Sequence, residues 1–212
     1  MKSNLKHQSN DPNCKGVEIL SIGTELLLGN IVNTNAQWIS EELSTLGLNH
    51  FRQSTIGDNS ERITKLIKEI SSRSNLLITT GGLGPTPDDL TTEAIAKSFN
   101  ATLSEREYLW DQIKKKLSIS GSTFNRSSLK KQCFFPKDAQ IINNPRGTAP
   151  GMIWKPIEGF TILTFPGVPS EMKEMWKETA VNYIKNNFSD GYIFFSNTLK
   201  FSGIGESTIS EK

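Results

Sequence analysis

Apolar residues recur along this 212-residue chain in two alternating patterns. Short apolar runs are typical of buried strands, whereas apolar residues three or four positions apart are typical of amphipathic helices. The predicted strands lie at 17–22, 48–56, 75–80, 140–142, 152–154, 161–165 and 192–201. The predicted helices lie at 35–46, around 63–70, through 95–99, at 104–117, near 127–132 and from 170 to 183. This alternation predicts an α/β fold with a mainly parallel sheet that is covered by helices on both faces.

Two of the predicted helices begin at polar sequences that can cap them. Ser104 and Glu107 form a capping box, which predicts that a helix opens at Ser104. Residues 58–60 offer polar side chains that can cap the helix around 63–70. The sequence therefore leaves Asp58 open between helix capping and a functional role.

The two ends of the chain differ from its middle. Residues 1–16 are polar and lack the apolar stretch of a signal peptide, so we expect a disordered N-terminal extension. Residues 17–187 contain enough apolar segments for one core and are expected to form one domain. Residues 188–212 contain a predicted strand and then a helix start near Gly203, with few residues left to complete it. We expect this tail to be the truncated start of a second, small α+β domain.

The composition excludes several classes of protein. The 24 Lys and Arg residues nearly balance the 22 Asp and Glu residues, and no basic run is interleaved with aromatic residues, so we expect no nucleic-acid partner. No apolar run reaches the length of a membrane span. The two cysteines, Cys14 and Cys133, lack metal-ligand spacing, which favours a reducing cytoplasm. The lysines at 114–116 are interpreted as a solvated helix face.

The segment after the predicted strand 75–80 carries the strongest functional signal. Gly81, Gly82 and Gly84 fall within four positions, so the backbone can turn tightly and present its N–H groups to an anion. A plain turn is the alternative, but a simple connection would not need three glycines. Asp88 and Asp89 follow at once, and two carboxylates beside a phosphate indicate a bound divalent cation such as Mg²⁺.

Polar residues also follow three other predicted strands. Because ligands bind beyond the carboxyl ends of parallel strands, the segments 23–25, 57–59, 79–82 and 165–170 are expected to line one cleft. A turn-rich loop at 143–151 can form a further wall. The candidate catalytic and metal-binding residues are Asp58, Asp88 and Asp89. The candidate phosphate- and nucleotide-binding residues are Thr24, Glu25, Thr79, Thr80, Gly81, Gly82, Gly84, Pro85, Thr86, Asn144, Gly147, Thr148, Pro166, Gly167 and Ser170.

Four motifs together resemble the CinA family of competence/damage-inducible proteins. They are GTELLLG at 23–29 with NTN at 33–35, TGGLGPT at 80–86 with DDLT at 88–91, NP at 144–145 with GTAPG at 147–151, and PGVPSEM at 166–172. The resemblance covers nearly all of the chain from residue 17 onward. It implies a three-layer α/β/α sandwich like the molybdopterin-binding domains of molybdenum cofactor biosynthesis, the MoaB/MogA superfamily.

The same resemblance implies an activity. In the wider superfamily the glycine loop holds the ligand phosphate, and aspartates at the positions of Asp58 and Asp89 carry function. In the CinA family this domain is associated with metal-dependent hydrolysis of the pyrophosphate of ADP-ribose. Many members add a C-terminal domain that deamidates nicotinamide mononucleotide, and we expect no such domain within these 212 residues.

The leading hypothesis is therefore a metal-dependent pyrophosphohydrolase that acts on a small-molecule nucleotide such as ADP-ribose. One alternative is a molybdopterin-type binding or adenylyl-transfer protein that uses the same phosphate cradle. The other is a non-enzymatic interaction module of the competence or DNA-damage apparatus. The sequence leaves open whether the protein forms a homo-oligomer.

Overall fold

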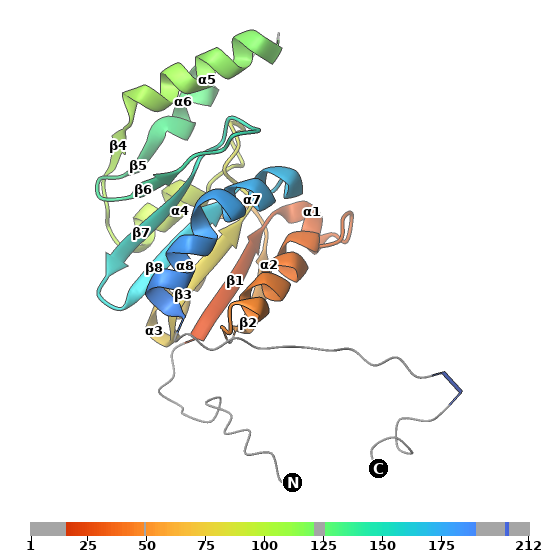
Figure 1. Ribbon diagram of the computed structural model, residues 1–212. Coiled ribbons are helices and arrows are strands. Elements are labelled where there is room, and N and C mark those ends of the chain that lie inside the picture. The colour runs from red at the N-terminus through yellow and green to blue at the C-terminus, as the bar shows by residue number, and fades with distance from the viewer. Residues whose placement is uncertain (1–15, 49, 121–125, 190–201, 204–212) are drawn as a thin grey trace.

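The computed structural model describes residues 16–48, 50–120, 126–189 and 202–203. A six-stranded sheet in the order β2-β1-β3-β8-β7-β6 occupies the centre of the molecule (Figure 1). Its strands are β1 Gly16–Ile22, β2 His50–Ile56, β3 Ser74–Thr80, β6 Gln140–Ile142, β7 Gly151–Ile157 and β8 Phe160–Phe165. Strands β2, β1, β3 and β8 are mutually parallel, while β7 runs antiparallel to both β8 and β6. The predicted mainly parallel sheet is thus confirmed.

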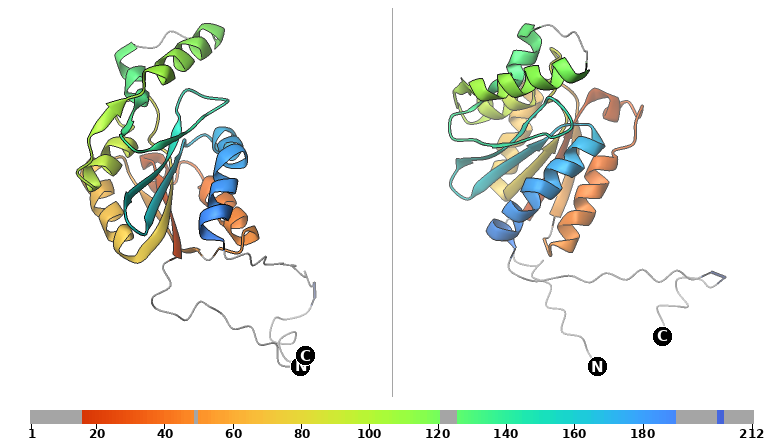
Figure 2. Two further views of the ribbon diagram at one scale, coloured as in Figure 1. Left: turned by 60° about the vertical axis from the view of Figure 1, so that its left-hand side comes forward. Right: turned by 45° about the horizontal axis from the view of Figure 1, so that its top comes forward.

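Helices cover both faces of this sheet, which gives the predicted three layers (Figure 2). The helical elements are α1 Thr24–Leu27, α2 Thr34–Thr45, α3 Ser60–Arg73, α4 Thr91–Ser98, α5 Glu107–Ser120, α6 Arg126–Lys130, the 3₁₀ turn η2 Lys131–Cys133, α7 Pro169–Met175, the π-helical turn η3 Trp176–Ala180 and α8 Val181–Phe188. Helices α2, α7 and α8 pack on one face, and α3 and α4 pack on the other.

The alternation of side chains along the central strands produces two separate cores. Val17 and Ile19 of β1 point toward α2 and α8, where they join Trp176 in one buried cluster. Leu20 and Ile22 point to the opposite face and join the buried cluster that contains α3 and α4. Because a strand has a side-chain period of two, each apolar run supplies both cores at once. This explains why these strands are continuously hydrophobic in sequence.

A short antiparallel ribbon lies beyond the carboxyl edge of the sheet, near the top of Figure 1, together with α5 and α6. It pairs β4 Leu103–Glu105 with β5 Phe134–Pro136. The predicted capping box at Ser104 is wrong. Ser104 lies in β4, and its hydroxyl donates to the carbonyl of Phe135. Helix α5 begins only at Glu107. The predicted extension 1–16 lies outside the described residues except for Gly16, which begins β1, and the predicted strand 192–201 lies wholly outside them.

Within the described ranges, no helix is both long enough and apolar enough to cross a bilayer. The thiol of Cys133 is free and buried, and desolvation, with a further contribution from the charge of Glu105, raises its pKa to about 11. This thiol is therefore protonated at neutral pH and unsuited to nucleophilic chemistry.

A partly buried ion pair lies at the amino-terminal end of the central strands. Arg73 donates to both carboxylate oxygens of Glu18 at 2.7 and 2.8 Å, and the hydroxyl of Ser74 donates to Oε1 at 2.6 Å. Burial by itself raises the pKa of the Glu18 carboxyl, but these hydrogen bonds outweigh it and hold the pKa below its ordinary value of 4.5.

Replacing Glu18 with glutamine should lower the free energy of unfolding by about 2 kcal/mol, because the buried side chain would lose its ionic hydrogen bonds to Arg73 and Ser74, while water can solvate the partly exposed Arg73. The folded-state pKa of Glu18 is depressed, so its stabilising contribution is present above the unfolded-state pKa and is lost as the pH falls through the folded-state pKa. Urea unfolding at neutral and acidic pH measures both effects. The matched control is Asp111→Asn, which removes an exposed pair with Lys114 and should cost below about 1 kcal/mol. Equal losses in the two variants would contradict this account.

Candidate functional site

A cleft of about 490 Å³ opens at the carboxyl edge of the sheet. It is formed by the segments that follow β1, β2, β3 and β8, together with the loop before β7. The predicted site residues that line it are Glu25, Asp58, Gly81, Gly82, Gly84, Pro85, Asp88, Asp89, Thr148, Pro166 and Gly167. The parallel topology therefore brings residues from all four predicted strand ends to one concave surface.

The glycine loop begins inside the sheet and ends as one wall of the cleft. Gly81 has a φ of 96°, and its N–H donates to the carbonyl of Phe165 at 3.0 Å, so this first amide completes the sheet. Gly82 has a φ of 64°, and the hydroxyl of Thr91 donates to the carbonyl of Gly81 at 2.8 Å. Among the described residues, nothing accepts a hydrogen bond from the amides of Gly82, Leu83 and Gly84. These three N–H groups therefore have no acceptor among the described residues, and the residues that carry them line the cleft.

The two adjacent aspartates are tied to the backbone of their own turn, residues 86–89, which we call the acidic turn. Asp89 accepts from the amide of Thr86 at 2.8 Å and from its hydroxyl at 2.5 Å, and the same hydroxyl also lies within hydrogen-bonding distance of Asp88. The hydrogen bond from Thr86 is the main reason that the pKa of Asp88 lies below its ordinary value, with the charge of Lys131 adding to it. Asp88 is therefore ionised at neutral pH in this turn.

Lys131 anchors the acidic turn. Its ammonium group donates to the carbonyls of Thr86 and Asp89 at 2.6 and 2.7 Å. Because Lys131 belongs to η2, this contact joins the turn to the segment that leads into β5. The ammonium charge also lies close enough to offset part of the repulsion between the neighbouring carboxylates.

Asp58 does not cap helix α3. Asn59 is the cap, since its side-chain oxygen accepts from the amide of Arg62 at 3.0 Å. One oxygen of Asp58 instead accepts from both the amide and the hydroxyl of Thr24 at 2.8 Å. This carboxylate therefore joins the start of α1 to the loop after β2, and it lines the cleft.

The loop at 143–150 is held by charged groups on both sides. The half-buried Lys116 of α5 donates to the carbonyls of Asn144 and Gly147, which corrects the interpretation of this lysine as part of a solvated face. Burial lowers the pKa of Lys116, while the charge of Glu171 opposes that shift. From α7, Glu171 accepts from the amide group of Asn144 at 2.7 Å. The loop therefore forms a fixed wall of the cleft.

Several predicted site residues support the cleft without lining it. Thr79 and Thr80 are buried at the end of β3, where they pair with β8, because the strand continues to Thr80 before the turn begins. Thr80 lines a smaller neighbouring hollow together with Gly167. The other predicted residues outside the cleft lining are Thr24, Thr86, Asn144, Gly147 and Ser170.

The candidate residues did not include Ile22, Gly23, Leu83, Gln132, Ala149, Val168 and Glu171, which also line the cleft, although Gly23, Ala149 and Val168 lie within segments that were expected to form it. Glu171 lies within the quoted segment 166–172, so its carboxylate could have been included. Gln132 carried no signal, since it reaches the cleft from a segment about fifty residues beyond the glycine loop.

The donor set of the cleft suits a hard divalent cation. Carboxylates of Glu25, Asp58, Asp88, Asp89 and Glu171 line it. Within the described part of the chain, no three His, Cys, Asp or Glu side chains lie close enough together to hold an ion by themselves. Mg²⁺ is commonly bound by one or two carboxylates together with substrate phosphates and water. The residues present therefore fit an ion that is bound together with a phosphate ligand.

Comparisons with known proteins agree with this architecture. Residues 18–186 match the family described as probable molybdopterin binding domain. A CinA-like protein of Prochlorococcus marinus subsp. pastoris is 98% identical over all of this chain and 49% of its own length. A CinA-like protein of Synechococcus sp. (strain CC9311) is 56% identical over 93% of this chain and 46% of its own length. The chain thus spans about half the length of these curated relatives.

Solved structures show the same relationship. One is the crystal structure of CinA from Thermoplasma acidophilum, which is described as a protein of unknown function. It is 34% identical in sequence, has a TM-score of 0.73, and the match covers 80% of this chain and 98% of that one. MoaB from Thermus thermophilus, titled as a molybdopterin biosynthesis enzyme, is 19% identical with a TM-score of 0.50, covering 82% and 98%, and this likeness shows the fold alone.

The chain has the α/β fold of MoaB, with the mixed, mainly parallel sheet described above. It belongs to the CinA-like family, through a domain of the probable molybdopterin-binding type.

Proposed function

We propose that the cleft binds the diphosphate of a nucleoside-diphosphate sugar such as ADP-ribose and hydrolyses it with the help of a divalent metal ion. The observation that carries the proposal is the pairing of three unengaged amides, at Gly82 to Gly84, with the carboxylates of the acidic turn. The amides suit phosphate oxygens, and the carboxylates suit a cation bound to the same phosphates.

Each group has an assigned part in the reaction. The amides of Gly82, Leu83 and Gly84 bind and orient one phosphate. Asp89 and Asp88 would hold the metal ion, which supplies charge neutralisation at the phosphate oxygens and acidifies water. Asp58 uses one oxygen for Thr24, and its other oxygen accepts no hydrogen bond from the described residues, so we assign that oxygen to orienting the attacking water.

The proposed reaction adds one water across the diphosphate bridge. The water oxygen forms a bond to one phosphorus atom while the bond from that phosphorus to the bridging oxygen breaks. The products are AMP and ribose 5-phosphate, with release of the proton that water loses. No covalent enzyme intermediate is required.

Incubation of the purified chain with ADP-ribose and Mg²⁺ tests the proposal directly. We expect AMP and ribose 5-phosphate in equal amounts, separated by chromatography, and no product when EDTA is in excess. A parallel panel of other nucleotide sugars and of Mn²⁺ defines preference. Absence of turnover across this panel, with the protein folded by circular dichroism, would contradict the proposal.

The family match also favours a second candidate, a molybdopterin-type binding or adenylyl-transfer protein that uses the same amides for a pterin phosphate. A fluorescent pterin that copurifies with the chain, combined with no hydrolysis of ADP-ribose, would favour this candidate.

A further inference from the structure

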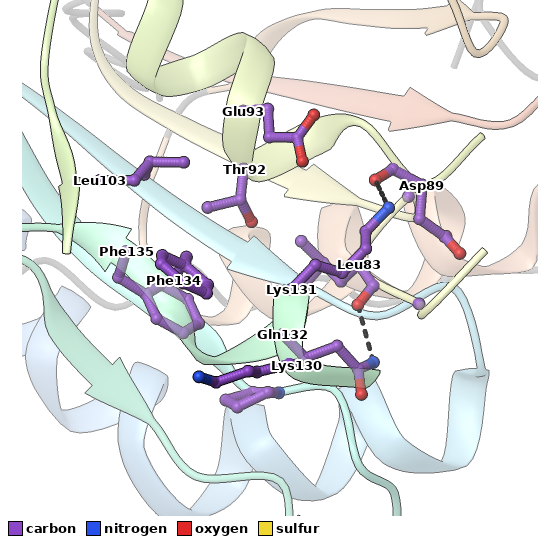
Figure 3. Close-up of a pocket in the computed structure, with 13 residues that line it drawn as sticks. Leu83, Asp89, Thr92, Glu93, Leu103, Lys130, Lys131, Gln132, Phe134 and Phe135 are labelled. Atoms are coloured by element: carbon purple, nitrogen blue, oxygen red, sulfur yellow. Dashed lines mark hydrogen bonds between the residues drawn. The ribbon is translucent and has the colours of Figure 1, made fainter. Parts of the chain in front are cut away.

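A second cavity, of about 500 Å³, is also lined by the glycine loop (Figure 3). We call it the side cavity. Its lining residues are Gly82, Leu83, Gly84, Asp89, Thr92, Glu93, Leu103, Lys130, Lys131, Gln132, Phe134, Phe135 and Pro150. Gly82, Leu83, Gly84, Asp89 and Gln132 also line the cleft, so the two spaces adjoin at the loop that carries the unengaged amides.

The lining of the side cavity suits an uncharged ring better than a second phosphate. Leu83, Leu103, Phe134 and Phe135 supply apolar surface to the cavity (Figure 3). Its two lysines are engaged elsewhere: Lys130 pairs with Glu105 at 2.9 Å, and Lys131 donates to two carbonyls of the acidic turn. The negative charges of Glu93 and Asp89 remain at its margin and disfavour an anion.

Gln132 supplies the polar group at the junction of the two spaces. Its side-chain nitrogen donates to the carbonyl of Leu83 at 3.0 Å, which fixes the orientation of the carboxamide because that carbonyl can only accept (Figure 3). The carboxamide oxygen is buried and accepts no hydrogen bond from the described residues, and the residue is 5% exposed. An acceptor left in this state destabilises the protein until a donor reaches it.

We propose that the side cavity binds a planar heterocycle that carries an amino group, and that the Gln132 oxygen accepts a hydrogen bond from that amino group. The inference rests on the proposed phosphate-binding cleft, but not on hydrolysis. The phosphate lies against the amides of Gly82 to Gly84 in the cleft, and the ring of the same ligand passes the loop into the side cavity. Because the oxygen is buried, contact with it requires the carboxamide of Gln132 to turn about its last side-chain bond, a soft torsion, against its hydrogen bond to Leu83.

The test compares ligands that differ only in the ring. AMP and ribose 5-phosphate share the sugar phosphate, and neither contains a diphosphate bond to hydrolyse, so calorimetric binding in Mg²⁺ is independent of turnover. We expect AMP to bind about tenfold more tightly or better, because only AMP can bury a ring. Equal affinities, or binding of neither ligand, would overturn the inference. Ring-dependent binding without hydrolysis of ADP-ribose would instead contradict only the proposed function.

Two variants locate the ring. Thr92→Trp fills the side cavity from α4 and should reduce AMP affinity to that of ribose 5-phosphate, while leaving ribose 5-phosphate binding unchanged. Lys97→Trp places the same side chain at an exposed position on the same helix and should change neither affinity. Equal loss for both ligands in Thr92→Trp, with an unchanged unfolding temperature, would show that the cavity does not receive the ring.

Gln132→Leu tests the polar contact. IMP carries a carbonyl in place of the amino group of AMP, so the unaltered protein should prefer AMP by about fivefold, and the variant should lose this preference. A preference that persists in Gln132→Leu would overturn the role of Gln132.

The phosphate ester of 6-hydroxymethylpterin distinguishes the two sources of an amino-bearing ring. If only that ester binds more tightly than ribose 5-phosphate, the ring in the cavity is a pterin. If only AMP does so, the ring is adenine.

Discussion

Replacing Asp89 with asparagine is expected to reduce metal-dependent turnover of ADP-ribose by about 100-fold or more, because the acidic turn would lose a charge that holds the cation. The fold should tolerate the change. The asparagine side-chain oxygen can still accept from the amide and hydroxyl of Thr86, so the free energy of unfolding should change by less than about 1 kcal/mol. Initial rates at saturating Mg²⁺ and urea unfolding measure the two quantities.

Asp111→Asn is the matched control for this substitution. Asp111 is an exposed carboxylate on α5 that pairs with Lys114. It lies outside the cleft lining, so turnover should stay at the level of the unaltered protein. Full activity in Asp89→Asn at saturating metal would remove Asp89 from its assigned role.

Replacing Gly81 with alanine should have the largest effect on the fold, with a loss of at least about 4 kcal/mol in the free energy of unfolding. An added Cβ would lie 2.0 Å from the backbone oxygen of Ile22, and neither backbone can move without breaking the pairing of β1 with β3. The φ of 96° adds strain for any residue with a side chain. Circular dichroism during thermal and urea unfolding measures the loss.

The control is Gly159→Ala in the turn between β7 and β8. Gly159 has a similar positive φ of 73°, but an added Cβ would meet nothing within 4 Å. Its loss should therefore be about 1–2 kcal/mol, the usual cost of a left-handed conformation. Comparable losses in the two variants would show that the contact with Ile22 is not the reason for Gly81.

The sequence predicts the position of the cleft well, because that position depends on the order and direction of the strands. Asp58 and Asp89 are thirty-one positions apart, yet each follows a strand that runs parallel to β1, so both reach one edge. Periodicity and turn residues were sufficient for that prediction.

The sequence predicts poorly where a side chain acts through a distant backbone group. Lys116 looks like a solvated lysine, and only the tertiary structure shows its amine at the carbonyls of Asn144 and Gly147. Gln132 becomes part of the site because η2 lies against the glycine loop, where the carboxamide of Gln132 donates to the carbonyl of Leu83. Neither contact has a local pattern, since both depend on elements that pair at long range.

The glycine loop illustrates both outcomes. Its glycines predict an anion-binding loop, which stays a prediction. The structure shows that the amide of Gly81 donates to Phe165, and that the lack of a side chain at Gly81 leaves room for the backbone of Ile22. The available amides begin one residue later, at Gly82. The sequence alone does not tell whether a glycine is required by packing or by a ligand, because both constraints are met by the same residue.

The central claim is that the amides of Gly82, Leu83 and Gly84 bind the ligand phosphate. Nuclear magnetic resonance of the ¹⁵N-labelled chain, titrated with a methylene-bridged ADP-ribose analogue and Mg²⁺, tests this most directly. We predict that these three amide signals move most at saturation, while the signal of Gly159, in the turn at the opposite edge of the sheet, stays in place. Saturable binding that leaves the three signals unchanged and shifts residues 155–161 would contradict the account.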